Sequence, residues 1–424
     1  MANKIQAVRG MHDVLPETAP CWQFLEQTIQ NILHQYSYQE IRLPILEKTE
    51  LFERSLGDHT DIVTKEMYTF IDRNGDSLTL RPEGTACCVR AGIEHGLFHA
   101  AALRLWYLGP MFRHERPQKG RLRQFHQIGV ETFGLDGPDI DAELMIMCAR
   151  IWKALNLDDL SLEINTLGTA GTRQKYREAL VEYFQSHKDS LDDESRTRLT
   201  KNPLRILDSK NPDVHKLVVT APVMTDYLDA ESMDHFSQLK TLLDSAKVHY
   251  KVNPRLVRGL DYYNKTVFEW MTGRLGAQGT VCAGGRYDGL VKHFGGPEIP
   301  AAGFAMGLER LISLLLDSAG NQPDQTPHIY FIIADDGAIP DGIRLAEELR
   351  DKMPSLRLLM HCGGGSFKSQ FKKADKSGAE FALILGENEL ETRTIGIKPL
   401  RGEGQQFECP WTELYPTLAK RLAG

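Results

Sequence analysis

The spacing of apolar residues near the start of the chain predicts a helix followed by strands. In residues 21–36 apolar side chains recur every three or four positions, which is typical of an amphipathic helix. The segment EIRLPILEKTELF, residues 40–52, is expected to be a strand that Pro44 interrupts. Because proline cannot donate a ladder hydrogen bond, we expect this strand at a sheet edge or an interface. Two alternating runs around Asn74-Gly75 predict a hairpin over residues 67–81.

A longer hairpin is predicted over residues 106–133. Two strand-like runs flank a connection, residues 113–123, that is rich in arginine and lysine and contains a proline. Because alternate side chains of a strand share a face, Phe125, Gln127 and Glu131 should point to one side, opposite a largely apolar face. The alternative is an exposed hairpin face whose polar residues are simply solvated.

The second half of the chain alternates between helical and strand-like segments. Residues 138–155 predict a helix, and residues 170–250 are charged and helical, as in an α-rich insertion. The segment AAGFAMGLERLISLLL, residues 301–316, passes from a small-residue strand into an apolar helix. We therefore expect a first domain over residues 1–320. After a linker, strands and helices alternate and predict an α/β domain over residues 327–424, with a mostly parallel sheet.

Length and charge narrow the class of protein. A chain of 424 residues exceeds one ordinary core, so two or three domains are expected. With 42% hydrophobic and 25% charged residues, the composition is that of a globular protein. The formal net charge of −7 excludes a general basic coat for nucleic acid. The cationic connection at residues 113–123 is nevertheless a local cluster that can contact phosphates.

Cysteine and histidine usage gives no sign of a metal site or a disulfide framework. The seven cysteines are scattered without a C-x-x-C pair, so reduced thiols are expected. His95 and His99 follow Glu94 at a spacing that metal ligands use, but no third ligand accompanies them, and no metal site is expected. The N-terminus lacks an apolar signal region and no apolar run reaches membrane-spanning length. We expect a cytoplasmic protein that binds no membrane.

Three short segments could have a functional or a purely structural role. GLDYYNKT, residues 259–266, has Asn264 where a P-loop needs its second glycine, and a strand-like run follows it, so we reject a P-loop. The three glycines at 363–365 precede a lysine-rich helix and form either a phosphate-cradling loop or an ordinary strand-to-helix turn. Glu83 and Thr85 stand at a helix start, where such side chains are most often caps.

Several motifs resemble those of the histidyl-tRNA synthetases, a class II aminoacyl-tRNA synthetase family. FRHERP followed by RQFHQ resembles motif 2 of that class, and residues 301–316 resemble motif 3. RGLDYY and TVCAGGRYDGL resemble the two histidine-specific motifs and are the most specific signals in the chain. Pro44 fits the motif 1 proline, which in that family lies at a homodimer interface. The resemblance covers the whole chain.

The resemblance implies an α+β fold, with a class II antiparallel sheet flanked by helices, an α-rich insertion and a C-terminal α/β anticodon-binding domain. It also implies ATP-dependent activation of L-histidine to histidyl-adenylate, with Mg²⁺, and transfer to the 3′ end of tRNA(His). The insertion would cover the acceptor end of that tRNA. Lys368, Phe371, Lys372 and Lys373 would be RNA contacts of the C-terminal domain.

The resemblance further implies two groups of site residues. Arg113 and Arg258 would be catalytic, flanking the α-phosphate and the substrate carboxylate, and Glu115 would orient ATP or its Mg²⁺. The expected histidine-binding residues are Glu83, Gly84, Thr85, Arg113, Gln127, Glu131, Arg258, Tyr262 and Tyr263. The expected ATP-binding residues are Arg113, Glu115, Arg121, Phe125 and Arg310. Such chemistry needs positioning and cations rather than a protein nucleophile.

Two other functions fit parts of the pattern. One is a non-catalytic histidine-binding paralogue, of the ATP phosphoribosyltransferase regulatory subunit type. That type lacks the C-terminal domain and has lost the motif arginines, whereas Arg113, Arg258 and Arg310 and the C-terminal segment are present here. The other is an RNA-binding regulatory module, which would not account for the pocket residues.

Overall fold

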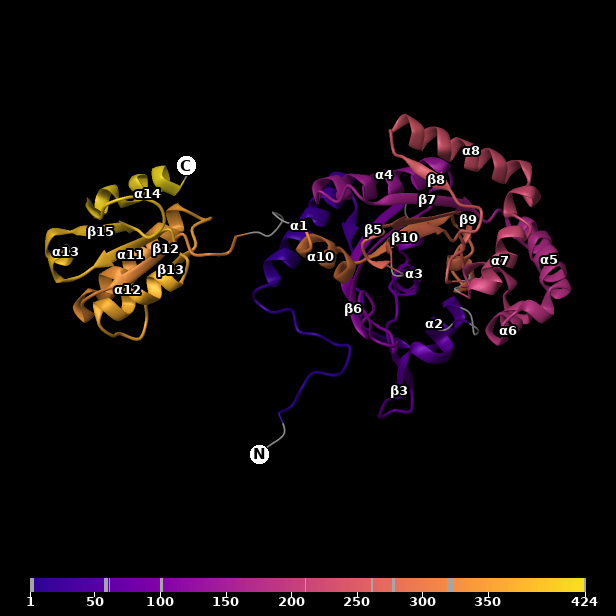
Figure 1. The fold of residues 1–424 in the computed structure, drawn as a ribbon, viewed down its shortest axis with the longest axis horizontal. Coiled ribbons are helices and arrows are strands. Elements are labelled where there is room, and N and C mark those ends of the chain that lie inside the picture. Colours follow the sequence, from indigo (N-terminus) through magenta and orange to yellow (C-terminus); the bar gives the residue numbers. More distant parts are fainter. Residues whose placement is uncertain are drawn as a thin grey trace. The chain divides into compact units, whose positions relative to one another are not determined.

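The computed structural model describes residues 4–56, 60, 62–99, 102–209, 211–260, 262–276, 279–318 and 324–422. The chain folds into two compact units, Met1–Gln322 and Pro323–Gly424 (Figure 1). Each unit has its own sheet and its own hydrophobic core. Residues 319–323, where the sequence predicts the end of the first domain and the start of the linker, lie outside the described residues, as does Asp261 of the RGLDYY segment.

The first unit is built on a large sheet of mainly antiparallel strands. Among the described residues its order is β1-β5-β6-β11-β10-β9-β7-β8, and only the pairs β1–β5 and β7–β8 run parallel. The strands are β1 (Gln39–Glu40), β5 (Leu103–Phe112), β6 (Gln124–Phe133), β7 (Ser161–Thr166), β8 (Tyr250–Val252), β9 (Asn264–Met271), β10 (Thr280–Arg286) and β11 (Ala301–Gly307). The predicted hairpin over residues 106–133 is the β5–β6 pair. The predicted antiparallel sheet is thereby confirmed.

One face of this sheet is covered by helices that form the larger core. These helices are α1 (Ala19–Gln35), α4 (Pro138–Ala154), α8 (Ala230–Ser245) and α10 (Leu308–Leu316), and Figure 1 shows α4 and α8 on the same side of the strands. Trp106, Ile128 and Val130 of the sheet pack there against Leu25 and Met145 of the helices. Burial of each such side chain contributes about 1.5–3 kcal/mol, so this core fixes the sheet on which the site is built.

The other face packs against α3 (Thr85–Glu94) and against helices from the predicted insertion. The latter are α5 (Ala170–Ser186), α6 (Asp193–Lys201) and α7 (Pro212–Thr220). Tyr176 and Leu180 of α5 join Tyr107 and Phe133 of the sheet in a second core cluster. The helix α8 also falls within residues 170–250, but it packs on α4 in the larger core. Strand alternation thus sends neighbouring residues of β5 and β6 into two different cores.

A small sheet and the helix beside it correct one prediction. The sheet contains β2 (Leu46–Lys48), β4 (Ser77–Leu80) and β3 (Tyr68–Ile71), in that order, and its β3–β4 pair is the predicted hairpin over residues 67–81. The prediction of a strand throughout residues 40–52 is wrong, because α2 spans Thr49–Leu56. In α2 the buried side chains of Leu51, Phe52 and Ser55 follow helical spacing rather than alternation.

The second unit is an α/β domain with a mixed sheet. Among its described residues the strand order is β13-β12-β14-β15-β16. The elements are β12 (Ile329–Ile333), α11 (Ile339–Lys352), β13 (Leu358–Met360), α12 (Phe367–Lys376), β14 (Phe381–Leu385), α13 (Glu387–Thr392), β15 (Thr394–Pro399), β16 (Phe407–Pro410) and α14 (Leu414–Leu422). The prediction of a mostly parallel sheet holds only for β12, β13 and β14, because β15 and β16 run antiparallel.

The glycines at 363–365 form the turn that leads into α12. Their φ angles are 89°, 64° and 104°, a region that residues with a Cβ rarely adopt. The next residue, Ser366, caps the helix by accepting a hydrogen bond from the backbone N–H of Ser369. Backbone geometry alone therefore explains why glycine stands at these three positions. No described helix of either unit combines the length and the apolar content needed to cross a bilayer.

Candidate active site

A cavity of about 210 Å³ opens in the first unit where β6, β10 and β11 meet the start of α3. It is lined by almost all the residues that the sequence predicts for the site, which come from segments far apart in the chain. These are Glu83, Thr85, Arg113, Glu115, Arg121, Phe125, Gln127, Glu131, Arg258, Tyr262, Tyr263 and Arg310. Gly84 is not part of the lining, although its neighbours on both sides are.

Strand β6 supplies one wall of the cavity through alternate residues. Phe125, Gln127 and Glu131 face the cavity, as the alternation predicts. Gly129, between them on the same face, pairs with Tyr107 of β5, and a Cβ at Gly129 would overlap the Tyr107 ring. A Cβ at Gly84 would overlap the same ring. Gly84 therefore acts on the site by leaving room for Tyr107 rather than by lining the cavity.

A buried carboxylate with three hydroxyl donors forms what we call the carboxylate cluster, made of Glu131, Thr85, Tyr107 and Tyr287. Glu131 is only 1% exposed and accepts hydrogen bonds from Thr85 Oγ1 at 2.8 Å and Tyr107 OH at 3.1 Å. The Tyr287 hydroxyl donates to its other oxygen. Burial raises the pKa of Glu131 to about 8, against the effect of these hydroxyl donors.

Glu83 caps α3 while also facing the cavity. Its carboxylate accepts hydrogen bonds from the backbone N–H groups of Thr85 at 2.8 Å and Ala86 at 2.9 Å. Burial raises the pKa of Glu83, although these N–H groups and the charge of Arg113 oppose that rise. The cap interpretation is correct for Glu83. It is not correct for the hydroxyl of Thr85, which donates to Glu131, whereas a capping oxygen would accept from a backbone N–H of the helix.

Three tyrosine rings stand together beside the carboxylate cluster. The ring centroid of Tyr262 lies 4.7 Å from that of Tyr263 and 5.5 Å from that of Tyr287. Burial raises the pKa of the Tyr262 hydroxyl, so this group stays neutral and acts as a hydrogen-bond donor or acceptor. The guanidinium of Arg258 lies over the Tyr263 ring at 5.7 Å.

Arg258 is held by an ion pair inside the cavity. Its partner is Glu269 of β9, which also accepts a hydrogen bond from Thr280 Oγ1 at 2.8 Å. Burial alone would lower the pKa of Arg258, but the negative charge of Glu269 helps to raise this pKa above its usual value. The Nε of Arg258 and the Oε1 of Gln127 are buried and, among the described residues, have no hydrogen-bond partner. These two polar atoms can form hydrogen bonds to water or to a polar ligand in the cavity.

Three further arginines form what we call the arginine cluster: Arg113, Arg121 and Arg310. Arg113 donates from Nε to the carbonyl of Pro82 at 2.9 Å, and its guanidinium lies over the Phe125 ring at 5.2 Å. Arg310 donates from Nε to the carbonyl of Gly120 at 3.0 Å.

The cationic groups of the arginine cluster repel one another. Burial lowers the pKa of Arg310, and the charges of Arg121 and Arg113 lower it further. Glu115 forms an ion pair with Arg121 at 3.3 Å and offsets part of this repulsion. A cavity lined by several like charges favours a multivalent anion, because its charge replaces mutual repulsion by attraction.

Some residues of the cavity were not predicted from the sequence. They are Tyr107 and Tyr287 in the carboxylate cluster and Glu309. Glu269, which pairs with Arg258 but is not part of the lining, was not predicted either. Glu309 accepts a hydrogen bond from the backbone N–H of His126 at 2.9 Å. Tyr287 lies within the TVCAGGRYDGL segment, so that motif was the available signal for it.

No group of three or more His, Cys, Asp or Glu side chains that could hold a metal ion occurs among the described residues. His95 and His99, considered as a ligand pair from the sequence, do not share a helix, because α3 ends at Glu94.

The chain matches known families over nearly its whole length. A family model described as histidyl-tRNA synthetase matches residues 10–311, and one described as anticodon binding domain matches residues 329–421. The chain belongs to the histidyl-tRNA synthetase family. Among other members, proteins named histidine–tRNA ligase from Alkalilimnicola ehrlichii and Halorhodospira halophila are 60% and 58% identical to it, over 99% and 97% of this chain and 97% of each relative.

Solved structures of histidyl-tRNA synthetases share the fold. The apo S. aureus histidyl-tRNA synthetase is 34% identical, with a TM-score of 0.81 over 98% of this chain and all of the other. A Bacillus halodurans protein described as an ATP phosphoribosyltransferase regulatory subunit/histidyl-tRNA synthetase is 22% identical, with a TM-score of 0.65 over 90% of this chain and 98% of the other. At that identity the likeness extends to the fold alone.

Proposed function

We propose that this chain is a histidine–tRNA ligase that activates L-histidine with ATP and transfers it to the 3′ end of tRNA(His). The observation that carries the proposal is one cavity that holds both a buried carboxylate with hydroxyl donors and four arginines, in a member of the histidyl-tRNA synthetase family. The first feature suits an imidazole, and the second suits a nucleoside triphosphate.

Histidine binds at the carboxylate cluster. Glu131 accepts the imidazole N–H, and the Tyr263 hydroxyl meets the other ring nitrogen, while Gln127 and Tyr262 shape the pocket. Glu83 and Thr85 bind the α-ammonium group. An apolar analogue would be buried against these polar groups without forming a hydrogen bond to any of them, so such a site rejects it strongly. The proposal is supported by the burial of Glu131 and by the Oε1 of Gln127, for which the described part of the chain offers no hydrogen-bond partner.

ATP binds at the arginine cluster. The histidine carboxylate attacks the α-phosphorus and pyrophosphate leaves, so negative charge develops on phosphate oxygens. Arg113 and Arg258 stabilise this charge at the α-phosphate. Arg121 and Arg310 hold the outer phosphates, and Phe125 stacks on adenine. Each charge-assisted contact of this kind contributes about 2–4 kcal/mol in the transition state.

The residues at the arginine cluster also fit Mg²⁺. This ion usually takes one or two protein carboxylates together with phosphate oxygens and water, and Glu115 and Glu309 both line this part of the cavity. When bound with ATP, Mg²⁺ would neutralise part of the triphosphate charge. Glu115 has a second role in the free protein, since it forms the ion pair with Arg121.

The rest of the chain supplies tRNA binding and assembly. Residues 329–421, which match an anticodon binding domain, bind the anticodon region, with Lys368, Phe371, Lys372 and Lys373 as RNA contacts. The helices α5–α7 belong to an insertion that covers the acceptor end of the tRNA. The protein is a cytoplasmic homodimer whose interface includes the region of Pro44.

A histidine-dependent ATP–pyrophosphate exchange assay tests the proposal. We expect exchange with L-histidine and none above background with other amino acids, because only an imidazole pairs with the carboxylate cluster. Histidine binding by calorimetry without any exchange would instead identify the non-catalytic regulatory paralogue. That alternative is not favoured, because the anticodon binding domain is present and the arginines line one cavity.

A further inference from the structure

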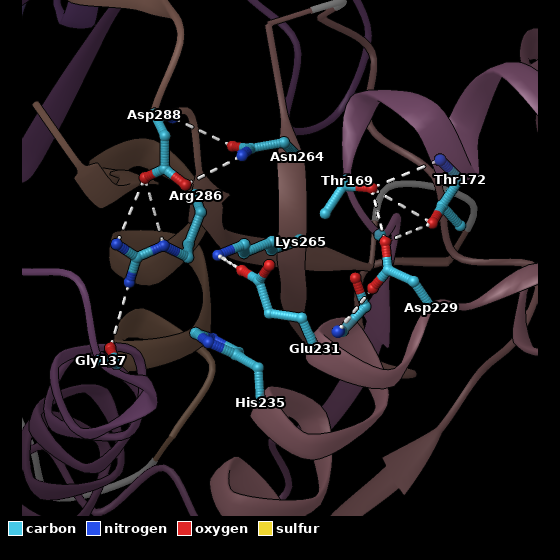
Figure 2. A network of polar contacts seen from close by, with 12 residues as sticks. Gly137, Thr169, Thr172, Asp229, Glu231, His235, Asn264, Lys265, Arg286 and Asp288 are labelled. Carbon is cyan, nitrogen blue, oxygen red and sulfur yellow. Dashed lines mark hydrogen bonds and ion pairs between the residues drawn. The ribbon is translucent and has the colours of Figure 1, made fainter. Parts of the chain in front are cut away.

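A polar network centred on the buried Arg286 joins residues next to the tyrosines of the cavity (Figure 2). Arg286 is fully buried at the end of β10, next to Tyr287. It donates to Asp141 Oδ1 at 2.7 Å, to the carbonyl of Gly137 at 3.2 Å and to the carbonyl of Leu135 at 2.7 Å. Leu135 and Gly137 lie within four residues of the end of β6, the strand that carries Glu131. The network therefore ties the segment of Tyr287 to the segment of Glu131.

The same network reaches the loop of Tyr262 and Tyr263 through a reciprocal pair of hydrogen bonds. The Asn264 side-chain amide donates to Asp288 Oδ2 at 2.9 Å, and the backbone N–H of Asp288 donates to Asn264 Oδ1 at 3.0 Å (Figure 2). Asn264 follows Tyr263, and Asp288 follows Tyr287. Two residues that flank pocket tyrosines are thus bonded directly to each other, although they stand 24 positions apart.

Asp288 connects this pair to the rest of the network. Its Oδ1 accepts hydrogen bonds from Arg286 Nε at 3.3 Å and from the backbone N–H of Ala301 at 3.0 Å. Ala301 begins β11, and two residues further on Gly303 lies against Glu131, where a Cβ would overlap the carboxylate. All three segments that carry the imidazole-binding groups, and β11 beside them, are therefore joined through Arg286 and Asp288.

Lys265 shows how tightly the Asn264 end of the network is held. Its φ is +43°, in the left-handed region that a residue with a Cβ enters only when its surroundings enforce it. Its backbone N–H donates to the carbonyl of Gly168 at 2.9 Å, and its Nζ lies 2.8 Å from Glu231 (Figure 2). These contacts from two other segments fix the start of β9, from which the Asn264 side chain projects.

We infer that Asn264, Arg286 and Asp288 are positioning residues that set the specificity of the site for histidine. This inference rests on the proposed function, because it assigns the imidazole pocket to the carboxylate cluster. None of these three residues lines the cavity. They fix Tyr263, Tyr287 and Glu131 relative to one another, so that hydrogen-bonding groups from three segments meet one planar ring. A site whose binding groups are held in fixed relative positions loses affinity when those positions change by a fraction of an ångström.

The test uses conservative changes, because removing the buried Arg286 would leave Asp141 with His235 as its remaining side-chain partner and would destabilise the fold itself. Asn264→Asp places two carboxylates against each other, and Asp288→Asn leaves two amides where an amide met a carboxylate. In the exchange assay we expect each single variant of the full chain to raise the KM for histidine about tenfold, with the KM for ATP changed by less than about twofold.

The reciprocal double variant Asn264→Asp with Asp288→Asn distinguishes positioning from mere stabilisation. It re-creates an amide–carboxylate pair with the partners exchanged, and the new amide oxygen still accepts from Arg286 and Ala301. We expect its KM for histidine to return to within about threefold of the wild type. A KM for histidine that stays raised when the double variant has regained the wild-type melting temperature would overturn the inference.

Asn211→Asp in the insertion is the matched control. The Asn211 amide donates to Asp192 Oδ2 at 2.8 Å, and its Oδ1 accepts the backbone N–H of Asp213 at 2.9 Å, so the same chemistry is altered away from the cavity. We expect no change in either KM.

Equal increases in the KM for histidine and for ATP in the Asn264 and Asp288 variants would show a structural role only. Absent exchange in the wild type would reject the proposed function as well, whereas normal wild-type exchange with unaltered variants rejects the positioning role alone.

Discussion

The carboxylate cluster and the arginine cluster line the same cavity but differ in how complete they are without a ligand. In the carboxylate cluster, Glu131 is already bonded to three hydroxyls, from Thr85, Tyr107 and Tyr287. In the arginine cluster, like charges face one another and lower the pKa of Arg310 further below the value that burial gives it.

This difference in completeness between the two clusters suits histidine and ATP, the two proposed ligands of the cavity. A small planar amino acid is selected by groups whose directions are set in advance, so the selecting groups are fixed by their own hydrogen bonds. A triphosphate carries several charges and is attracted by cations that gain stability only when the anion arrives. Substitutions in the two clusters should therefore separate histidine recognition from nucleotide binding and from catalysis.

Arg258→Ala should have the largest effect, because the proposed mechanism places Arg258 at the α-phosphate where the reaction occurs. We expect the rate of histidine-dependent pyrophosphate exchange to fall about a hundredfold or more. Arg258→Lys keeps a charge beside Glu269 but loses the planar fork, and it should also be slow. Arg104→Ala, which breaks an ion pair with Glu143 outside the cavity, is the control. Exchange near the wild-type rate in Arg258→Ala would contradict the catalytic role.

Glu131→Ala should damage histidine recognition selectively. Without the carboxylate the hydroxyls of Tyr107 and Tyr287 and the imidazole N–H lose their acceptor, so we expect histidine affinity to fall by at least about thirtyfold. The KM for ATP should stay close to that of the wild type. Isothermal calorimetry with histidine measures the first quantity, and the exchange assay measures the second. Unchanged histidine affinity would remove Glu131 from the pocket.

Arg121→Ala should show the opposite selectivity and a smaller effect. Its side chain is 38% exposed, so solvent and salt weaken its attraction for phosphate, and we expect the KM for ATP to rise about fivefold. Histidine affinity should not change. A titration of ATP at two ionic strengths provides the check, because the difference between wild type and variant should shrink at high salt. An equal loss of histidine affinity would show that the clusters are not separable.

The pKa of Glu131 gives a prediction for the free protein. The folded state holds the proton up to about pH 8, whereas an unfolded glutamate with a pKa of 4.5 has released it by then. Between these values the folded state binds more protons, so this contribution to stability is lost as pH rises. The side chain in Glu131→Gln does not titrate. The free energy of unfolding of this variant, relative to that of the wild type, should therefore rise by about 1 kcal/mol per pH unit in this window.

Thermal unfolding of both proteins from pH 5 to pH 8 measures this difference. A melting-temperature difference that is constant over the range would mean that Glu131 is ionised throughout in the folded protein.

The wall supplied by β6 could be predicted from the sequence because it depends only on local geometry. Phe125, Gln127 and Glu131 share a face of a strand whatever folds around them. Tyr107 and Tyr287 could not be found that way. Each stands in a mostly apolar or small-residue run, and their common partner Glu131 lies 24 and 156 positions away. Pairing at such separations is set by the sheet order, which no local pattern specifies.

The errors in the fold have a similar physical origin. The helix α2 has two turns, and its period is hidden because an alternating run with a proline leads directly into it. The antiparallel strands β15 and β16 follow parallel ones in a domain whose earlier pattern is of the βαβ type. A short apolar strand carries no information about the direction of its neighbour. Local signals therefore located the elements but not all their partners.

The three glycines around Tyr107 and Glu131 also define how the size of this pocket could change. Gly84 and Gly129 lie where a methyl group would strike the Tyr107 ring, and Gly303 lies where one would strike the Glu131 carboxylate. No methyl group can therefore be added at these three positions unless the Tyr107 ring or the Glu131 carboxylate moves. An engineered enzyme for a bulkier ring-substituted histidine would gain its space by shortening Tyr107, with the glycine backbone left untouched.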